Sequence, residues 1–430
     1  MSYVARLSRQ GRRLAAERAA GGRRSLPAAA AFGAIALCGA GLIVADAVAG
    51  FGERRDPPMA LAAAGGDASA LAQVAQARVD SRGGPESLAE AERLANASLR
   101  AQALNPAAFR VLGEVADARG DKARAVALFR AAARLTRRDT ITGASLLADD
   151  LQRGDVVAAV RQADVILRYA PEVSNEVFPP LAQMARDAKG QPTLAQQLAT
   201  RPAWRPGFLT FLAGGEDPNV ALDLMGRLAD LGAPATDAEI SPLLNRMVDH
   251  HQYLQAFLAW QQLSPGAATR LRGNVRDGDF DGQAGAPPFG WNLQNSSGAS
   301  AEILQGPTAG AAGSALKVSY DGVSIATPAR QLMILGPGVY HLAVKAYVSA
   351  PRAATHLGWT VRCAEDNRPL ASTPDLALDP GWNTLGADFA VPAGCEGQWL
   401  SLTAIPGEHS DDVEVWYDAL EVRRTALAPA

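Results

Sequence analysis

The chain lacks the short motifs that mark most enzymes. Its 430 residues contain no Gly-x-Ser-x-Gly elbow, no His-Glu-x-x-His helix, no Walker loop and no dinucleotide fingerprint. Only five histidines occur, and His250 and His251 are expected on one helix, where neighbours point about 100° apart and suit a shared metal poorly. No spacing selects the two opposed carboxylates that a glycosidase needs. We therefore expect a chain without catalytic activity.

Lysine and cysteine are scarce. Four lysines stand among 41 basic residues, so nearly all positive charge comes from arginine. Of three cysteines, Cys38 lies in an apolar run, where it is best explained as a small apolar side chain. Cys363 and Cys395 lie near one another in the sequence at a spacing that fits no zinc pattern. In an oxidising compartment such a pair can form a disulfide, which we predict here.

Positive charge is concentrated at the start of the chain. The first 25 residues hold seven arginines and one acid, Glu17, while the whole chain has a net charge of −3. The remainder is therefore acidic, which argues against a nucleic-acid partner because phosphate binding needs a basic face.

One long apolar run follows this basic tail. Residues 26–45 carry no charge, and about 20 such residues are enough for a helix to cross a bilayer. The positive-inside rule then predicts a cytoplasmic tail (1–25), a single transmembrane anchor (26–50), a linker (51–67) and a periplasmic body in a bacterial inner membrane. The alternative is a cleaved signal peptide ending at the small residues 47–49, although the run is longer than is usual for one.

Residues 68–263 show helical spacing of leucine and alanine, and about two units over residues 105–171 repeat with a period of 34 residues. The first repeat is marked by large residues, small residues and a glycine break: Phe109, Leu112, Gly113, Ala116, Gly120, Ala125, Phe129 and Ala132. Advancing by the period gives Leu146, Gly154, Ala159 and Ala163; Pro171 closes this second unit, and Pro106 closes the unit that precedes the first. This zone resembles a tetratricopeptide repeat protein, although Arg137 stands where a proline is expected. The resemblance implies an all-α solenoid that binds a protein partner; the alternative is a set of irregular helix pairs that act as a spacer.

Residues 270–424 change to short alternating runs bounded by glycine and proline, which predicts strands. We expect them near 279–280, 301–304, 315–320, 329–334, 338–348, 356–363, 382–391, 398–404 and 413–423. The zone opens with Gly278, Asp279, Phe280 and Asp281, has Trp291 a dozen residues later, and closes with an aromatic-Asp-apolar strand at 415–422. In these motifs it resembles a carbohydrate-binding-module jelly roll, with residues 275–277 interrupting the usual opening.

The resemblance implies two kinds of site. Such modules often hold a structural calcium, for which Asp279, Asp281 and Asp418 are the candidates because calcium prefers carboxylate oxygens. They bind sugars by stacking aromatic rings on pyranose C–H groups. The candidate aromatic residues are Trp291, Trp359, Trp382, Trp399 and Trp416, with Tyr320 and Tyr347. Many modules of this kind bind no sugar and serve in assembly instead.

The sequence thus predicts a multidomain protein with an N-terminal transmembrane helix, a helical solenoid and a C-terminal β-sandwich. We expect a non-enzymatic scaffold in the assembly or export of a surface polysaccharide, which contacts a glycan or a second protein through the sandwich. A purely structural protein-interaction module of a cell-envelope or secretion complex is the first alternative. A polysaccharide-modifying enzyme is the second.

Overall fold

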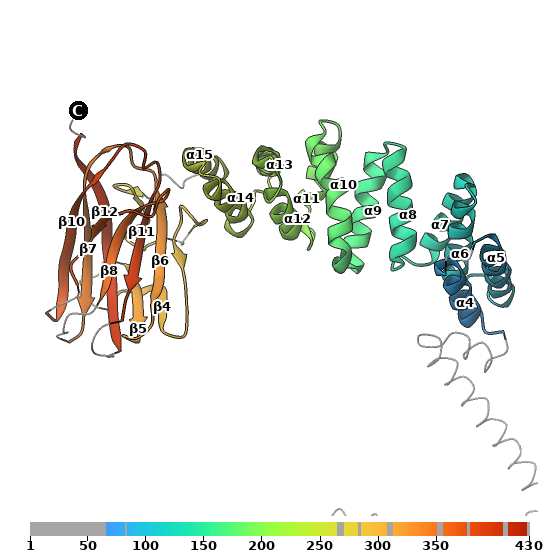
Figure 1. The fold of residues 1–430 in the computed structure, drawn as a ribbon, viewed down its shortest axis with the longest axis horizontal. Coiled ribbons are helices and arrows are strands. Elements are labelled where there is room, and N and C mark those ends of the chain that lie inside the picture. Colours follow the sequence, from blue (N-terminus) through green and yellow to red (C-terminus); the bar gives the residue numbers. More distant parts are fainter. Residues whose placement is uncertain are drawn as a thin grey trace, which may run out of the picture. The chain divides into compact units, whose positions relative to one another are not determined.

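The computed structural model describes residues 66–81, 84–264, 271–282, 285–307, 313–350, 356–375, 379–406 and 412–427 (Figure 1). Its contacts divide the chain into two compact units, Met1–Arg153 and Gly154–Ala430, each with hydrophobic clusters of its own. The described residues of the first unit, 66–81 and 84–153, form helices and no strands. The second contains further helices and then a β-sandwich.

The predicted membrane anchor is a point of correction. Residues 1–65, which include the predicted tail and anchor, lie outside the described residues. Within the part of the chain that is described, no helix combines the length and the hydrophobicity needed to cross a bilayer. The longest of these helices, α5 (Gly84–Ala101), has Glu and Arg spaced along it. A transmembrane element and an inner-membrane location are therefore not supported, and the fold class is corrected to a helical region followed by a β-sandwich.

Twelve helices are described, and they occupy the zone that the sequence assigns to helices. They are α4 (Ala68–Asp80), α5 (Gly84–Ala101), α6 (Pro106–Ala118), α7 (Lys122–Leu135), α8 (Thr140–Gln152), α9 (Val156–Tyr169), α10 (Ser174–Arg186), α11 (Gly190–Ala199), α12 (Arg205–Ala213), α13 (Pro218–Asp230), α14 (Asp237–Asp249) and α15 (Tyr253–Leu263).

Capping side chains explain where many of these helices begin. A carboxylate or amide oxygen accepts a hydrogen bond from a backbone N–H of the first turn, which satisfies a donor that the helix leaves free. The residues that do so are Asp67, Asn105, Asp121, Asp139, Asp155 and Asp217. Gly120 and Gly154 adopt positive φ angles of 83° and 70° directly before two of these caps, and glycine tolerates that conformation without strain.

Close helix packing in the first unit depends on small residues. The Gly113 backbone on α6 lies so near the Phe129 ring on α7 that an added Cβ would stand 2.7 Å from the ring. Ala125 and Ala132 of α7 are fully buried. The contact explains why the sequence places glycine opposite phenylalanine, while assignment of the helices to the tetratricopeptide family stays a prediction.

A buried ion pair joins helices in the second unit. The Arg205 guanidinium at the start of α12 donates to both Glu239 oxygens on α14, at 2.9 and 3.0 Å, and also to the backbone carbonyls of Leu198 and Pro234. Both side chains are at most 5% exposed. Thr236 and Glu239 form a reciprocal capping box, so the same carboxylate also fixes the start of α14.

The end of the helical zone differs from the prediction in one respect. The sequence predicts His250 and His251 on one helix, but the chain turns at these residues, where His251 has a φ of 58°. The two histidines therefore lie between α14 and α15 and share no helix.

The strands follow after the helices. They are β1 (Leu271–Arg272), β2 (Val275–Arg276), β3 (Asn292–Leu293), β4 (Ala299–Gln305), β5 (Ser314–Tyr320), β6 (Ala326–Met333), β7 (Gly338–Val348), β8 (Leu357–Cys363), β9 (Pro369–Ser372), β10 (Gly381–Val391), β11 (Gln398–Ala404) and β12 (Val413–Leu427). The expected strand at 279–280 is wrong: Phe280 has a φ of 53° and lies at the end of a turn.

Two five-stranded antiparallel sheets form the sandwich (Figure 1). One has the order β10-β7-β12-β5-β4 and the other β3-β6-β11-β8-β9. Burial alternates along several strands, as in β7, where buried and half-buried positions follow one another from Gly338 to Val344. Each sheet thus turns one face to the core and the other to solvent.

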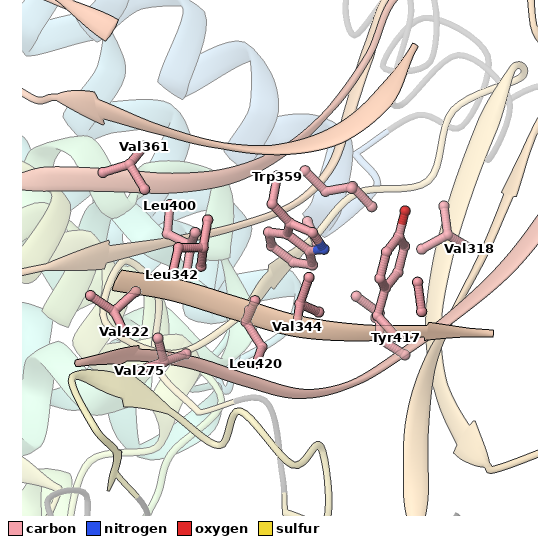
Figure 2. Close-up of a cluster of buried hydrophobic side chains, with 14 of the residues drawn as sticks. Val275, Val318, Leu342, Val344, Trp359, Val361, Leu400, Tyr417, Leu420 and Val422 are labelled. Carbon is pink, nitrogen blue, oxygen red and sulfur yellow. The ribbon is translucent and has the colours of Figure 1, made fainter. Parts of the chain in front are cut away.

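The core lies between the facing sheets (Figure 2). Trp359 on β8 meets the Tyr417 ring on β12 edge-on, with centroids 5.6 Å apart, and both side chains are fully buried. Leu342, Leu400 and Val318 fill the space around them. Burial of this cluster stabilises the sandwich, at roughly 25 cal/mol per Å² of apolar surface removed from water.

We expect Glu239→Gln to destabilise the second unit by about 3 kcal/mol, because it leaves the Arg205 charge buried without its carboxylate. Urea unfolding followed by far-UV circular dichroism measures this loss. Arg168→Gln is the matched control, since the Arg168–Asp164 pair is half-exposed on the arginine side and should contribute under about 1 kcal/mol. Equal losses in both variants would contradict the structural role assigned to the buried pair.

Candidate functional site

A row of aromatic side chains crosses the solvent face of the first sheet. In the strand register Tyr347 on β7 lies opposite Trp382 on β10 on one side and Trp416 on β12 on the other. All three side chains are half-buried, and all point away from the sandwich core. Because neighbouring strands are about 4.8 Å apart, the row spans about 10 Å across the sheet.

The two ends of this aromatic row have different surroundings. The Trp382 and Tyr347 rings contact each other, with centroids 5.4 Å apart and tilted by 51°. At the other end the Lys317 ammonium lies 5.6 Å from the centre of the Trp416 ring and 2.9 Å from a Glu414 carboxylate oxygen. The Trp416 indole N–H also donates to Glu414, at 3.3 Å. The row therefore passes from an apolar end to a charged, hydrogen-bonding end.

A polar hollow continues the row at its charged end. Its volume is about 470 Å³, and its lining includes Ser300, Ser319, Asp321 and Glu414. Glu414, Ser319 and Ser300 lie opposite one another on β12, β5 and β4, one step along the strands from Trp416. Residues two apart on a strand share a face, so the hollow and the aromatic row form one continuous surface.

Asp321 shapes the rim of the hollow. Its carboxylate accepts hydrogen bonds from the backbone N–H groups of Val323 and Ser324, both at 2.9 Å, and from the Ser324 hydroxyl at 2.8 Å. These bonds favour the ionised form and lower the pKa of Asp321. The hollow thus presents a fixed negative charge beside several hydroxyl groups.

This surface suits a ligand with both apolar and hydroxylated faces. Aromatic rings offer flat apolar area with little conformational entropy to lose, and the serine, lysine and carboxylate groups offer hydrogen bonds. A pyranose chain has that combination, since its C–H groups lie on the ring faces and its hydroxyls on the rim.

Two of the tryptophans named from the sequence are corrected by their burial. Trp291 is 1% exposed and Trp359 is fully buried. The Trp291 indole N–H donates to the Asp277 carbonyl at 3.1 Å, and its ring packs against Phe280 and Trp359. Neither ring has a face free for a sugar, because both fill the space between the sheets.

The other aromatic candidates lie apart from the row. Trp399 is half-buried on the solvent face of the second sheet, where the Arg330 guanidinium covers its ring at 4.7 Å. Tyr320 is 2% exposed and belongs to the core. Of the tryptophans proposed from sequence, the structure thus groups only Trp382 and Trp416 on one face.

The three candidate calcium ligands lie near one another, but each has its own ion-pair or hydrogen-bond partner. Asp279 pairs with Arg272, Asp281 accepts from the Ser314 N–H at 2.7 Å, and Asp418 accepts from the Ala419 N–H at 2.6 Å. Burial, with the negative charges of Asp279 and Asp281, raises the pKa of Asp418. Among the described residues their oxygens do not converge within 4.8 Å, as the ligands of one ion would, and calcium stays a prediction.

The predicted cysteine pair is joined in the structure. Cys363 and Cys395 form a disulfide with their Cα atoms 5.6 Å apart. They lie with Glu365 in the one described group of three potential metal ligands, but disulfide sulfurs are poor ligands because they carry no thiolate. The bridge links the end of β8 to the turn before β11.

Sequence reasoning missed the polar part of the site. Lys317, Glu414, Ser300 and Ser319 carry no motif, and only the register of β12, β5 and β4 brings them together beside Trp416. The scarcity of lysine offers one signal: the two lysines of the sandwich, Lys317 and Lys345, both lie on the face with the aromatic row.

We expect Asp418→Asn to raise the melting temperature at about pH 7 by roughly 2 °C, because ionised Asp418 is disfavoured in the fold. A raised folded-state pKa means that stability falls as pH rises through it, so the difference should vanish below about pH 3, where the wild-type carboxyl is protonated in both states. Calcium held by Asp418 would raise the wild-type melting temperature and leave the variant unchanged. Equal stabilisation of both by calcium would exclude this residue as a ligand.

Comparison with known proteins gives matches of structure only. No protein-family model matches the chain, and no curated protein sequence does either. A bacteriophage CBA120 tailspike enzymatic domain is similar over 36% of this chain at 14% identity and a TM-score of 0.27, but the match spans only 21% of the tailspike chain.

Carbohydrate-binding modules match over nearly their whole length. The CBM22-1 xylan-binding domain from Paenibacillus barcinonensis is 12% identical over 35% of this chain and 93% of its own, and a CBM4 structure is 15% identical over 35% and 99%, both with TM-scores of 0.27. The C-terminal β-sandwich thus resembles carbohydrate-binding modules, and at these identities and scores the likeness says nothing about what this chain binds.

Proposed function

We propose that this chain is a non-enzymatic adaptor whose β-sandwich binds a polysaccharide along the aromatic row. The helical region would bind a protein, and the setting would be the assembly or export of a surface polysaccharide. A row of three half-buried aromatic rings on the solvent face of one sheet is the single observation on which the proposal depends.

The arrangement of the row supports an extended sugar chain as its ligand. Trp382, Tyr347 and Trp416 lie side by side across β10, β7 and β12, so a chain crossing the strands meets each ring in turn. About 10 Å of aromatic surface fits roughly two pyranose rings. The remaining tryptophans of the sandwich are buried or, for Trp399, covered by an arginine.

The polar hollow supports recognition by hydrogen bonds beyond the stacked rings. Ser300, Ser319 and Glu414 lie one step along the strands from the row, so they can bond the hydroxyls of a sugar that turns aside from the row at Trp416. The Lys317–Glu414 pair would reorganise on binding, because the ammonium lies over the Trp416 ring that a sugar would stack on.

For the helical region, repeated hairpins are the supporting feature. In the first unit α4 packs on α5 and α6 on α7, and stacked hairpins of this kind present long surfaces to protein segments. The alternative is a chain that binds proteins only, and a test of glycan binding distinguishes it from the proposed adaptor.

A glycan array with the full chain should identify a bound oligosaccharide, and Trp382→Ala and Trp416→Ala should each weaken its binding about tenfold, or ~1.4 kcal/mol. Isothermal titration calorimetry measures the change. Trp399→Ala on the opposite sheet is the matched control and should bind like wild type. Loss of binding in the control but not in the row variants would contradict the aromatic row as the site, and no glycan bound at all would leave the protein-interaction alternative.

A further inference from the structure

Helix α15 has one face of large aromatic side chains. Tyr253, Phe257 and Trp260 recur at spacings of four and three residues, which places them on the same side of the helix. Tyr253 and Trp260 are 2% and 1% exposed. Leu254 and Leu258, by contrast, are more than half exposed.

The buried aromatic face of α15 meets a residue from the start of the β-sandwich. The Phe289 ring lies 5.3 Å from that of Phe257 and 5.5 Å from that of Trp260, centre to centre. Phe289 is itself 2% exposed, so α15 buries a side chain that belongs to neither sheet. The Arg276 guanidinium, from β2, takes part in the same contact, because it lies 5.6 Å from the centre of the Trp260 ring.

A second contact joins α15 to the disulfide loop. The Tyr253 ring lies against Gly397, where an added Cβ would stand only 2.9 Å from a ring carbon. The loop is held firmly: Glu365 accepts from the N–H groups of Glu396 and Gly397, at 2.6 and 3.2 Å, and Cys395 is bonded to Cys363. Burial, with the negative charges of Glu365 and Glu396, raises the pKa of Tyr253.

We propose that α15 acts as a clamp: it holds the sandwich through two contacts, one with Phe289 and one with the Gly397 loop. The sandwich surface formed by Phe289 and the Gly397 loop therefore has α15 of the same chain as its partner. Through this contact the sandwich is held rigidly to the helices of its unit. A ligand on the aromatic row would be kept in a fixed relation to whatever α9–α15 bind. The inference does not depend on the identity of that ligand.

Gly397→Ala in the full chain tests the clamp with a single methyl group. Gly397 does not have a positive φ, so alanine strains no backbone there, and the nearest obstacles are the Tyr253 ring and then the Ala364 side chain. We expect amide hydrogens of residues 253–263 to exchange about tenfold faster, measured by hydrogen–deuterium exchange mass spectrometry. Strands β7 and β12, which belong to the other sheet, should keep their protection.

Gly336→Ala is the matched control, because nothing lies within 4 Å of a Cβ added there and its backbone is also outside the left-handed region. A Tyr253→Ala background gives the second test, in which Gly397→Ala should add no further increase since the clash is gone. Unchanged exchange of α15 in Gly397→Ala, or an equal increase in the control, would overturn the clamp. An increase spread over all sandwich strands would also overturn it, since the methyl group would then act on the sandwich and not on the helix contact.

Discussion

A two-sheet sandwich can bury only every second side chain of a strand, and this alternation governs the function proposed for the chain. Trp359 and Tyr417 occupy inward positions and fill the space between the sheets, where each is fully buried. Trp416 directly precedes Tyr417 on β12 and must therefore point outward. The alternation of side chains along β12 thus places Tyr417 in the core and Trp416 in the aromatic row.

The same constraint sets the chemistry around the row. Lys317 and Glu414 are outward positions on β5 and β12, so their ion pair lies beside Trp416 and not in the core. Asp418, two residues beyond Trp416 on β12, meets the acids of the turn that follows β2, and its burial, together with the negative charges of Asp279 and Asp281, raises its pKa. A face that brings together rings, hydroxyls and partly satisfied charges is suited to a polar, extended ligand, whereas the facing sheet presents Trp399 already covered by Arg330.

Local patterns in the sequence were enough to locate most elements. Helical spacing and the glycine breaks gave a helical zone that ends at Leu263, as α15 does, and the strands at 338–348 and 398–404 match β7 and β11 residue for residue. The break at His250 and His251 was missed because no glycine or proline marks it. The membrane anchor rested on hydrophobicity alone, and no spanning helix is found among the residues that the structure describes.

The candidate site was harder to predict, since it depends on which strands pair. Trp291 and Trp359 look no different from Trp382 and Trp416 in sequence, because each sits in an alternating apolar run or beside one. Only the pairing of β10, β7 and β12 separates the exposed tryptophans from the buried ones. Lys317 and Glu414 lie almost 100 residues apart in the chain, so no local motif could join them.

The most direct test of the account is fluorine NMR of the full chain labelled with 5-fluorotryptophan, titrated with an oligosaccharide found on the array. The seven tryptophans give a separate probe for each environment. If the glycan binds on the aromatic row, the Trp382 and Trp416 resonances shift with ligand while those of Trp291, Trp359 and Trp399 stay in place. Shifts confined to Trp399, or to tryptophans of the helices, would contradict a glycan site on the β10-β7-β12 face.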